Sequence, residues 1–185
     1  MNKLDDTRTF IPLSIAVMTI SDTRTLEDDK SGLTLVSKLE ETGQILVDRT
    51  IVQDDINAIR TQIQAWIAKP DIDVILTTGG TGFTGRDVTP EAIEPLFEKK
   101  MDGFSTVFHA ISYGKIGTST LQSRATAGLA GANSGTPTFV FCLPGSPGAC
   151  RDAWDGILAM QLDYRHKPCN FVEIIPRLDE HLKRK

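Results

Sequence analysis

The stretch Val74-Ile-Leu-Thr-Thr-Gly-Gly-Thr-Gly-Phe-Thr-Gly-Arg-Asp-Val-Thr-Pro90 joins a short apolar run to a glycine-rich loop and a helix start. Its first five residues end at paired glycines, a pattern typical of a central strand that is buried on both faces. Thr89-Pro90-Glu91 then offers a capping hydroxyl, a proline at the first helical position and an acid in the first turn. We therefore expect a buried parallel strand, a loop and a helix running to about Lys99.

Strands and helices alternate on both sides of this stretch. Apolar runs predict strands at 13–20, 45–52 and 138–142, and apolar residues at helical spacing predict helices at 31–41, 56–67, 104–113 and 149–162. Ser31 is the expected cap of the first helix, and Asp54 or Asp55 of the second. Residues 114–135 are rich in small side chains and yield no assignment. The alternation predicts an α/β protein, a three-layer αβα sandwich around a mostly parallel sheet.

The composition predicts one domain over residues 1–185, with 1–11 as an N-terminal arm and 165–185 as a C-terminal tail. The 24 acidic and 20 basic residues give a net charge of −4, which argues against general binding to nucleic acid or anionic lipid. No apolar run reaches the length of a membrane span, and Met1 to Arg8 is polar and acidic. We expect a cytoplasmic protein without nucleic-acid or membrane partners.

Cysteine and histidine spacing does not indicate a zinc site. Cys142, Cys150 and Cys169 form no CxxC pair, and the three histidines are scattered along the chain. Reduced and mostly buried thiols are the favoured interpretation.

Four segments follow predicted strands or lie at their carboxyl ends: 21–31, 53–55, 79–89 and 144–148. Ligands bind at this edge of parallel sheets. The glycines of Gly79 to Gly85 let backbone N–H groups approach an anion closely, and the following helix start adds positive potential. The alternative is that these glycines only turn the chain, but a tight turn needs one or two glycines rather than four. The loop is therefore predicted to hold a phosphate-bearing small molecule.

Two familiar nucleotide motifs fail on this loop. Gly80, Gly82 and Gly85 have the spacing of the dinucleotide fingerprint, but the helix start lies beyond the motif and the loop follows the third predicted strand. Gly80 and Gly85 also have P-loop spacing, yet Arg86-Asp87 stands where a lysine and a hydroxyl residue should be. The sequence therefore favours neither a Rossmann nor a Walker A site.

Asp54 and Asp87 are candidate metal ligands. Each alone is more simply explained as a residue that caps or stabilises a helix start. Together they end two segments that come close at one edge of a parallel sheet, which is a suitable arrangement for Mg²⁺ beside bound phosphates. Leu143-Pro-Gly-Ser-Pro147 is either a rigid turn or a second wall of the same pocket.

Several groups of residues match one known family in order along the chain. They are Thr78-Gly-Gly-Thr-Gly82, Arg86-Asp-Val-Thr-Pro-Glu-Ala92 and Leu143-Pro-Gly145, supported by Ile20-Ser-Asp22, Asp29-Lys-Ser-Gly32 and Leu121-Gln-Ser-Arg-Ala125. From about residue 13 to 162, the chain resembles the MoaB/Mog family of molybdenum-cofactor biosynthesis. The stretches 116–124 and 168–171 are more similar to its MoaB branch.

The resemblance implies the molybdopterin-binding fold and an enzyme, a molybdopterin adenylyltransferase, with Mg²⁺ as cofactor. The terminal phosphate of molybdopterin would attack the α-phosphate of ATP, giving adenylylated molybdopterin and pyrophosphate. Because this nucleophile is already an anion, the reaction needs screening of phosphate repulsion more than a strong base. Carboxylates and glycines without a histidine suit that requirement.

By motif, the resemblance assigns Asp54 and Asp87 to catalysis and to Mg²⁺. It assigns substrate binding to Ser21, Asp22, Ser31, Gly32, Gly79, Gly80, Thr81, Gly82, Ser123, Pro144 and Gly145. Cys142 departs from the family pattern, which commonly has Asn directly before the Leu-Pro-Gly turn, so we expect one polar contact fewer in the site.

Two rival functions stay open. A catalytically silent homologue would bind molybdopterin or act as a scaffold, although this chain retains both aspartates, which favours an active enzyme. An unrelated nucleotide-binding α/β protein would bind ATP without affinity for a pterin. The resemblance further implies a homo-oligomer, trimer or hexamer, and the downstream molybdenum-insertion protein as a partner.

Overall fold

A six-stranded sheet with the order β3-β2-β4-β7-β6-β5 forms the centre of the computed structural model, which describes residues 3–183. Its strands are β2 (Ser14–Ile20), β3 (Ile45–Val52), β4 (Val74–Thr78), β5 (Lys99–Lys100), β6 (Thr126–Ala130) and β7 (Thr138–Leu143). The neighbours from β3 to β7 are parallel, whereas β6 and β5 are added antiparallel. The predicted mostly parallel sheet is confirmed.

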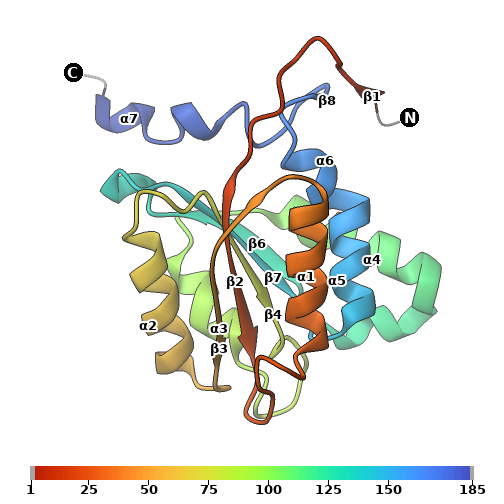
Figure 1. The fold of residues 1–185 in the computed structure, drawn as a ribbon. Coiled ribbons are helices and arrows are strands. Elements are labelled where there is room, and N and C mark those ends of the chain that lie inside the picture. The colour runs from red at the N-terminus through yellow and green to blue at the C-terminus, as the bar shows by residue number, and fades with distance from the viewer. Residues whose placement is uncertain (1–2, 184–185) are drawn as a thin grey trace.

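Helices cover both faces of this sheet. They are α1 (Lys30–Glu41), α2 (Ile56–Ile67), α3 (Thr89–Ile93), α4 (Asp102–Ile116), α5 (Pro147–Ala153), α6 (Ala159–Gln161) and α7 (Glu180–Lys183). A π-helical turn, Trp154–Leu158, joins α5 to α6. Helices α2 and α3 lie on one face, and α1, α4 and α5 on the other, which gives the predicted three layers (Figure 1). None of the helices in residues 3–183 is both long and apolar enough to span a membrane.

The alternating side chains of β4 explain its continuous apolar sequence. Val74 and Leu76 face the core beneath α1, α4 and α5, where Trp154 is fully buried. Ile75 faces the opposite core with Trp66 of α2. Since successive residues of a strand point to opposite faces, a strand between two helical layers needs apolar residues at every position.

The connections around β2 create a crevice at one end of the sheet. The chain leaves β2, crosses through α1 to β3 on one side, and returns through α2 to β4 on the other side of β2. The two crossovers lie on opposite faces of the sheet (Figure 1). Loops that leave neighbouring strands in opposite directions open a space between them, where ligands bind in open α/β sheets.

The N-terminal arm and the C-terminal tail hold each other at the opposite end of the sheet. Strand β1 (Lys3–Leu4) pairs antiparallel with β8 (His166–Lys167). Asp5 forms an ion pair of 2.6 Å with Lys167, and Arg8 Nη1 donates to the Tyr164 carbonyl at 3.1 Å. Residues 1–2 and 184–185 of the predicted arm and tail lie outside the described residues.

The helix expected from Thr89 to about Lys99 is shorter, and this prediction is wrong in its extent. Helix α3 ends at Ile93, a 3₁₀ turn follows, and the chain extends into β5. Pro95 has no N–H to donate to the Glu91 carbonyl, so the α-helical bonding pattern stops there. Arg60 of α2 donates to the Glu91 carbonyl instead, at 3.2 Å.

Strand β6 lies in the segment 114–135, for which no element was expected. Its sequence, Thr-Ala-Gly-Leu-Ala, has one β-branched residue, Thr126, and no aromatic residue, so few of the residues that mark strands are present. Gly128 explains part of this composition, because the Phe97 ring lies where a Cβ at residue 128 would be. Small side chains in this strand make room for the packing of the 3₁₀ turn that follows α3.

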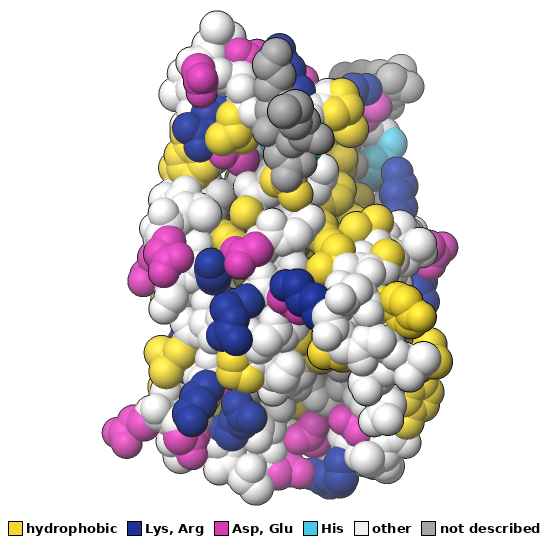
Figure 2. Space-filling view, turned by 90° about the vertical axis from the view of Figure 1, so that its right-hand side faces the viewer, with side chains coloured by type: hydrophobic (Ala, Val, Ile, Leu, Met, Phe, Trp, Pro, Cys, Tyr) yellow, Lys and Arg dark blue, Asp and Glu magenta, His cyan; other side chains and the backbone are white. Residues whose placement is uncertain are grey.

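The surface beside α1, α4 and α5 carries charges of both signs. Figure 2 shows basic, acidic and hydrophobic side chains interspersed over this side of the molecule. Lys38 of α1 approaches Asp155 of the π turn at 2.9 Å, and Lys115 of α4 pairs with Asp152 of α5. These pairs connect neighbouring helices, although exposed ion pairs contribute little free energy.

A buried carboxylate, Asp29, fixes the start of α1 beside the crevice. It is the N-cap of α1 and accepts from the Gly32 amide at 2.9 Å, which corrects the expectation that Ser31 caps this helix. Its other donors are Thr19 Oγ1 at 2.6 Å, Arg49 Nη2 at 3.0 Å and Ser31 Oγ at 3.1 Å. Burial by itself raises the pKa of this carboxyl, but the donors outweigh burial and hold the pKa below its ordinary value.

Gly32 makes this arrangement possible. A Cβ at residue 32 would overlap Asp29 Oδ2 and Thr19 Oγ1. The helix can therefore approach its capping carboxylate and β2 only if residue 32 has no side chain.

Replacing Asp29 tests its role in stability. Asp29→Asn should lower the free energy of unfolding at pH 7 by about 3 kcal/mol, because it removes a buried, ion-paired acceptor. The folded-state pKa is lowered, so this stability is present above about pH 4 and is lost as the pH falls through the folded-state pKa. Urea unfolding of both proteins between pH 7 and pH 2 should show the difference shrinking on acidification.

Asp28→Asn is the matched control, because Asp28 is exposed and its carboxylate accepts from the Thr25 amide in the same loop. It should change stability by less than about 0.5 kcal/mol. An equal loss in both variants would contradict the role of Asp29.

Candidate functional site

A cavity of about 260 Å³ lies at the carboxyl ends of β2 and β4. It is lined by Thr19, Ile20, Ser21, Arg24, Ser31, Asp54, Thr78, Gly79, Gly80, Arg86, Asp87 and Gly145. All four segments expected at this edge of the sheet contribute to it. A larger cavity of about 350 Å³ between α4 and the π turn has no charged residue in its lining. We therefore place the candidate site at the strand ends, where charged side chains from several loops meet.

The glycine-rich loop crosses the end of β2 at close range. Gly79 has a φ of +109°, and a Cβ at this position would overlap the Ile20 carbonyl oxygen. The Thr89 hydroxyl donates to the Gly79 carbonyl at 2.9 Å, and the Thr89 amide donates to the Gly80 carbonyl at 2.9 Å. Thr89 therefore closes the base of the loop, and the expectation that its hydroxyl caps α3 is wrong.

Asp54 faces this loop, and its neighbour takes the capping role. Asp55 is the N-cap of α2 and accepts from the Ala58 amide at 2.8 Å. The Asp54 Oδ1 atom lies about 3.0 Å from the position that a Cβ on Gly80 would occupy. Burial raises the pKa of Asp54, and the nearby carboxylates of Asp22 and Asp87 raise it further.

Asp87 braces the loop while it lines the cavity. Its Oδ2 atom accepts from the Thr84 amide at 2.9 Å and from the Thr84 hydroxyl at 2.6 Å. Burial alone raises the pKa of Asp87, but hydrogen bonds from Thr84 and the Gly82 amide outweigh it and leave the pKa lowered. The two aspartates of the cavity are thus in opposite electrostatic situations.

Arg86 connects the glycine-rich loop to the loop that follows β2. Its guanidinium is paired with Asp22, with Nε 2.9 Å from Oδ2. Asp22 also accepts from the Asp54 amide at 3.2 Å. Asp22 therefore ties together the loops after β2, β3 and β4 at the rim of the cavity, without lining it.

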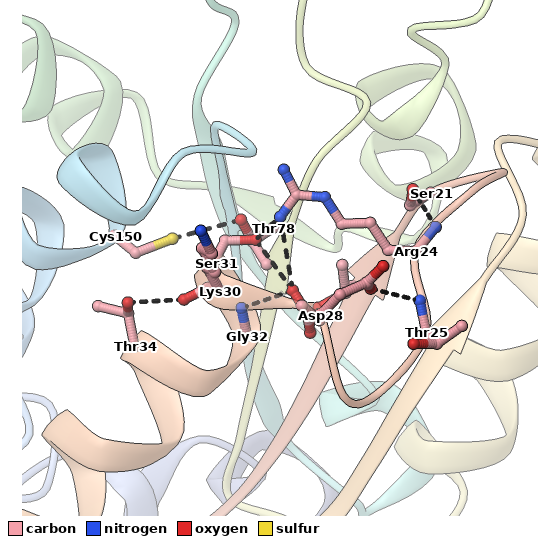
Figure 3. Close-up of polar contacts among 12 residues, drawn as sticks. Ser21, Arg24, Thr25, Asp28, Lys30, Ser31, Gly32, Thr34, Thr78 and Cys150 are labelled. Carbon is pink, nitrogen blue, oxygen red and sulfur yellow. Dashed lines mark hydrogen bonds and ion pairs between the residues drawn. The ribbon is translucent and has the colours of Figure 1, made fainter.

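Arg24 supplies a second positive charge, and it was not among the expected site residues. Its Nη1 atom lies 3.4 Å from Ser31 Oγ and 3.9 Å from Asp29 Oδ1, as Figure 3 shows for the labelled Arg24 and Ser31. The sequence signal that points to Arg24 is its basic side chain within segment 21–31, because that segment was expected at the ligand-binding edge of the sheet.

The loop after β7 forms the opposite wall. Thr78 Oγ1 donates to the Pro144 carbonyl at 2.9 Å. The same atom lies 3.3 Å from Cys150 Sγ (Figure 3). Gly145 packs against Gly79, since a Cβ on residue 145 would be 3.1 Å from the Gly79 Cα. The segment is therefore a wall of the pocket as well as a rigid turn.

Some residues assigned to substrate binding do not line this cavity. They are Asp22, Gly32, Thr81, Gly82, Ser123 and Pro144. The Thr81 and Gly82 carbonyls accept from Arg124, and Ser123 Oγ donates to the Thr120 carbonyl at 3.3 Å. Gly32 and Pro144 lie behind the residues that line the cavity. Gly32 packs against Asp29, and the Pro144 carbonyl accepts from Thr78.

Cys142 lies inside β7, packed in the core beneath α2 and α3. Burial raises the pKa of its thiol to about 12, so the group stays neutral at physiological pH. At this position a side chain faces the core and does not reach the cavity.

A family model described as a probable molybdopterin binding domain matches residues 16–164. Molybdenum cofactor biosynthesis protein B of Escherichia coli K12 is 51% identical over 162 residues, which cover 88% of this chain and 92% of that protein. The protein of the same name from Bacillus subtilis is 42% identical over 147 residues, covering 79% and 84% of the two chains.

Solved structures agree with these sequence relatives. A crystal structure of a molybdenum cofactor biosynthesis protein B has a TM-score of 0.78 at 37% identity and covers 96% of this chain and 100% of its own. The tungsten cofactor synthesizing protein MoaB from Pyrococcus furiosus has a TM-score of 0.71 at 32% identity, covering 91% and 98%. The motifs that form the cavity lie inside the matched region, so the chain belongs to the MoaB/Mog family of molybdopterin-binding domains.

Proposed function

We propose that this chain is a nucleotidyltransferase of molybdenum cofactor biosynthesis, which transfers the adenylyl group of Mg-ATP to molybdopterin. One observation carries the proposal. Two carboxylates, Asp54 and Asp87, and two guanidinium groups, Arg24 and Arg86, face one cavity beside a glycine-rich loop. Such a set suits a reaction between two phosphate groups, in which like charges must be brought together.

The reaction makes one bond and breaks one bond. An oxygen of the terminal phosphate of molybdopterin attacks the α-phosphorus of ATP, the bond between the α-phosphorus and the bridging oxygen breaks, and pyrophosphate leaves with that electron pair. The nucleophile carries its negative charge before it attacks, so no side chain has to remove a proton. The task of the protein is to hold the reacting groups in line and to offset their charge.

The donor set of the cavity fits a magnesium ion. Asp54 has a raised pKa because burial and the carboxylates of Asp22 and Asp87 disfavour its charge, and a bound divalent cation would relieve this repulsion. In residues 3–183 no three Asp, Glu, His or Cys side chains form a metal-binding group. Two carboxylates are the number that Mg²⁺ commonly uses when phosphates complete its coordination. When bound, the ion would neutralise charge on the phosphates of ATP.

The arginines and the loop complete the binding of phosphate. Arg86 lies at the mouth with 66% of its side chain exposed, and its pairing with Asp22 holds the guanidinium beside the cavity. Arg24 approaches from the opposite loop, next to the Ser31 hydroxyl. One guanidinium can donate two parallel N–H bonds to two oxygens of the same phosphate. Two arginines on separate loops can therefore hold two phosphates in a fixed relative position.

Release of pyrophosphate separates this function from silent binding. The purified full chain with molybdopterin, ATP and Mg²⁺ should release pyrophosphate above a control without enzyme, and replacement of Mg²⁺ by excess EDTA should abolish the release. Tight binding of molybdopterin without any pyrophosphate would instead identify the silent binding or scaffolding homologue. Binding of ATP without affinity for the pterin would point to an unrelated nucleotide-binding protein.

Asp54 is expected to act in turnover more than in pterin binding. Asp54→Asn should lower kcat by at least about 100-fold while the Kd for molybdopterin changes less than threefold. Asp55→Asn is a charge-matched control on the next residue, and it should leave kcat nearly unchanged because Asn caps a helix as well as Asp does. Steady-state pyrophosphate release and pterin titration measure both quantities. Equal losses of kcat in the two variants would argue against a specific role for Asp54.

Asp87 has two separable roles, which Thr84 can distinguish. Asp87→Asn should lower kcat by at least about 100-fold, because it removes the charge that the metal requires. Thr84→Val removes only the hydroxyl that donates to Asp87 and should lower kcat less than about tenfold. If both variants lose activity equally, Asp87 acts only by bracing the loop. If Asp87→Asn mainly weakens pterin binding, its assignment to the metal is wrong.

A further inference from the structure

Arg124 lies outside the cavity, just before β6, yet it contacts the glycine-rich loop at several points. Its backbone N–H donates to the Thr81 carbonyl at 2.8 Å. Its Nε atom donates to the Gly82 carbonyl and its Nη2 atom to the Asp87 carbonyl, each at 2.7 Å. One side chain therefore holds the loop at two points that are five residues apart in sequence.

Two further contacts orient the guanidinium itself. Nη1 is paired with Glu91 of α3, and the guanidinium carbon lies 5.4 Å from the centre of the Phe83 ring. Phe83 is 71% exposed, so it packs on Arg124 rather than in the core. Arg124 is anchored to the first turn of a helix and covered by a ring from the same loop that it holds.

We propose that Arg124 is the positioning residue of the glycine-rich loop. By binding the carbonyls of Gly82 and Asp87, it fixes the position of the loop relative to β4. The position of the Asp87 carboxylate relative to Asp54 is fixed as a result. It does not line the cavity and does not touch the reacting groups. The consequence for catalysis rests on the proposed function, whereas the hold on the loop does not.

The chemistry of the side chain explains why an arginine is needed. A guanidinium has five N–H donors in a rigid plane and can serve three acceptors in three directions at once. Here Nε, Nη1 and Nη2 each serve a different acceptor. A lysine has one flexible ammonium group, which can keep the ion pair with Glu91 but cannot hold both loop carbonyls in the same geometry.

The remaining bonds of the loop show why this hold matters. Thr89 closes the base of the loop, and the Thr84 to Asp87 bonds close its tip. Arg124 links Gly82, in the part of the loop that leads away from β4, with Asp87, in the part that leads back to α3. Without it, the tip can move as a unit while its internal bonds stay intact, and Asp87 would move with it.

The test compares Arg124→Lys and Arg124→Ala with two controls in the full chain. Arg60→Ala removes another arginine that donates to two carbonyls, those of Glu91 and Ala92, but none in the loop. Glu91→Gln removes the charge of the ion pair and keeps the loop carbonyls available. Hydrogen exchange of peptides covering residues 79–89, urea unfolding, and kcat and KM for molybdopterin at saturating ATP are measured for each protein.

Both Arg124 variants should speed exchange in the loop at least tenfold and raise KM or lower kcat at least tenfold. Arg60→Ala and Glu91→Gln should change each quantity less than threefold. The proposal is overturned if loop exchange in Arg124→Lys equals that of the wild type, or if Glu91→Gln reproduces the effect, since the ion pair alone would then be responsible. It is also overturned if the variants lose stability in urea while their kinetic constants stay unchanged.

A separate outcome concerns the proposed function. If the wild-type chain binds molybdopterin but releases no pyrophosphate, the adenylyltransferase assignment fails and the Kd for molybdopterin replaces the kinetic constants. Loop exchange still decides whether Arg124 holds the loop. Rapid loop exchange in Arg124→Lys with slow exchange in Arg60→Ala would support that hold, whereas exchange as slow as in the wild type would overturn the proposal.

Discussion

The parallel pairing of β2 with β4, with crossovers on opposite faces, determines the rest of the site. The loop after β2 turns toward α1, and the loop after β4 turns toward α3, so a space is left between them. Gly79 allows the second loop to pass against the Ile20 carbonyl, and no other residue type fits there without displacing the backbone. Arg24, Arg86 and Asp87 reach the cavity from these two loops, and Asp54 reaches it from the loop after β3.

The electrostatics of the cavity follow from that convergence. Three aspartates, Asp22, Asp54 and Asp87, lie on three loops that meet in one place, and each finds a different balance of burial and donors. Asp22 is satisfied by Arg86, and Asp87 by Thr84. Asp54 has the weakest compensation, and it is the carboxylate whose charge an added cation would stabilise most.

The local sequence predicted those parts of the molecule that depend on local chemistry. The apolar run of β4 and the glycine density of the loop are encoded within a few residues, and so is the cap of α2, which was expected at Asp54 or Asp55 and is Asp55. The capping role of Asp29 was missed, because it depends on Thr19 and Arg49, which reach it from β2 and β3. Strand β6 was missed because few of its residues have strand propensity, and one of them, Gly128, leaves room for the distant Phe97 ring. Arg24 and Arg124 were not selected, since their importance lies in contacts with distant loops.

The pairing of β1 with β8 fixes the start of the described chain at the amino-terminal edge of the sheet, away from the cavity, and α7 lies at the same end of the molecule on the other side (Figure 1). A molecule held by this end on a solid support would present its cavity to the solution. Both ends of the described residues therefore lie away from the carboxyl ends of β2 and β4, where the cavity is (Figure 1).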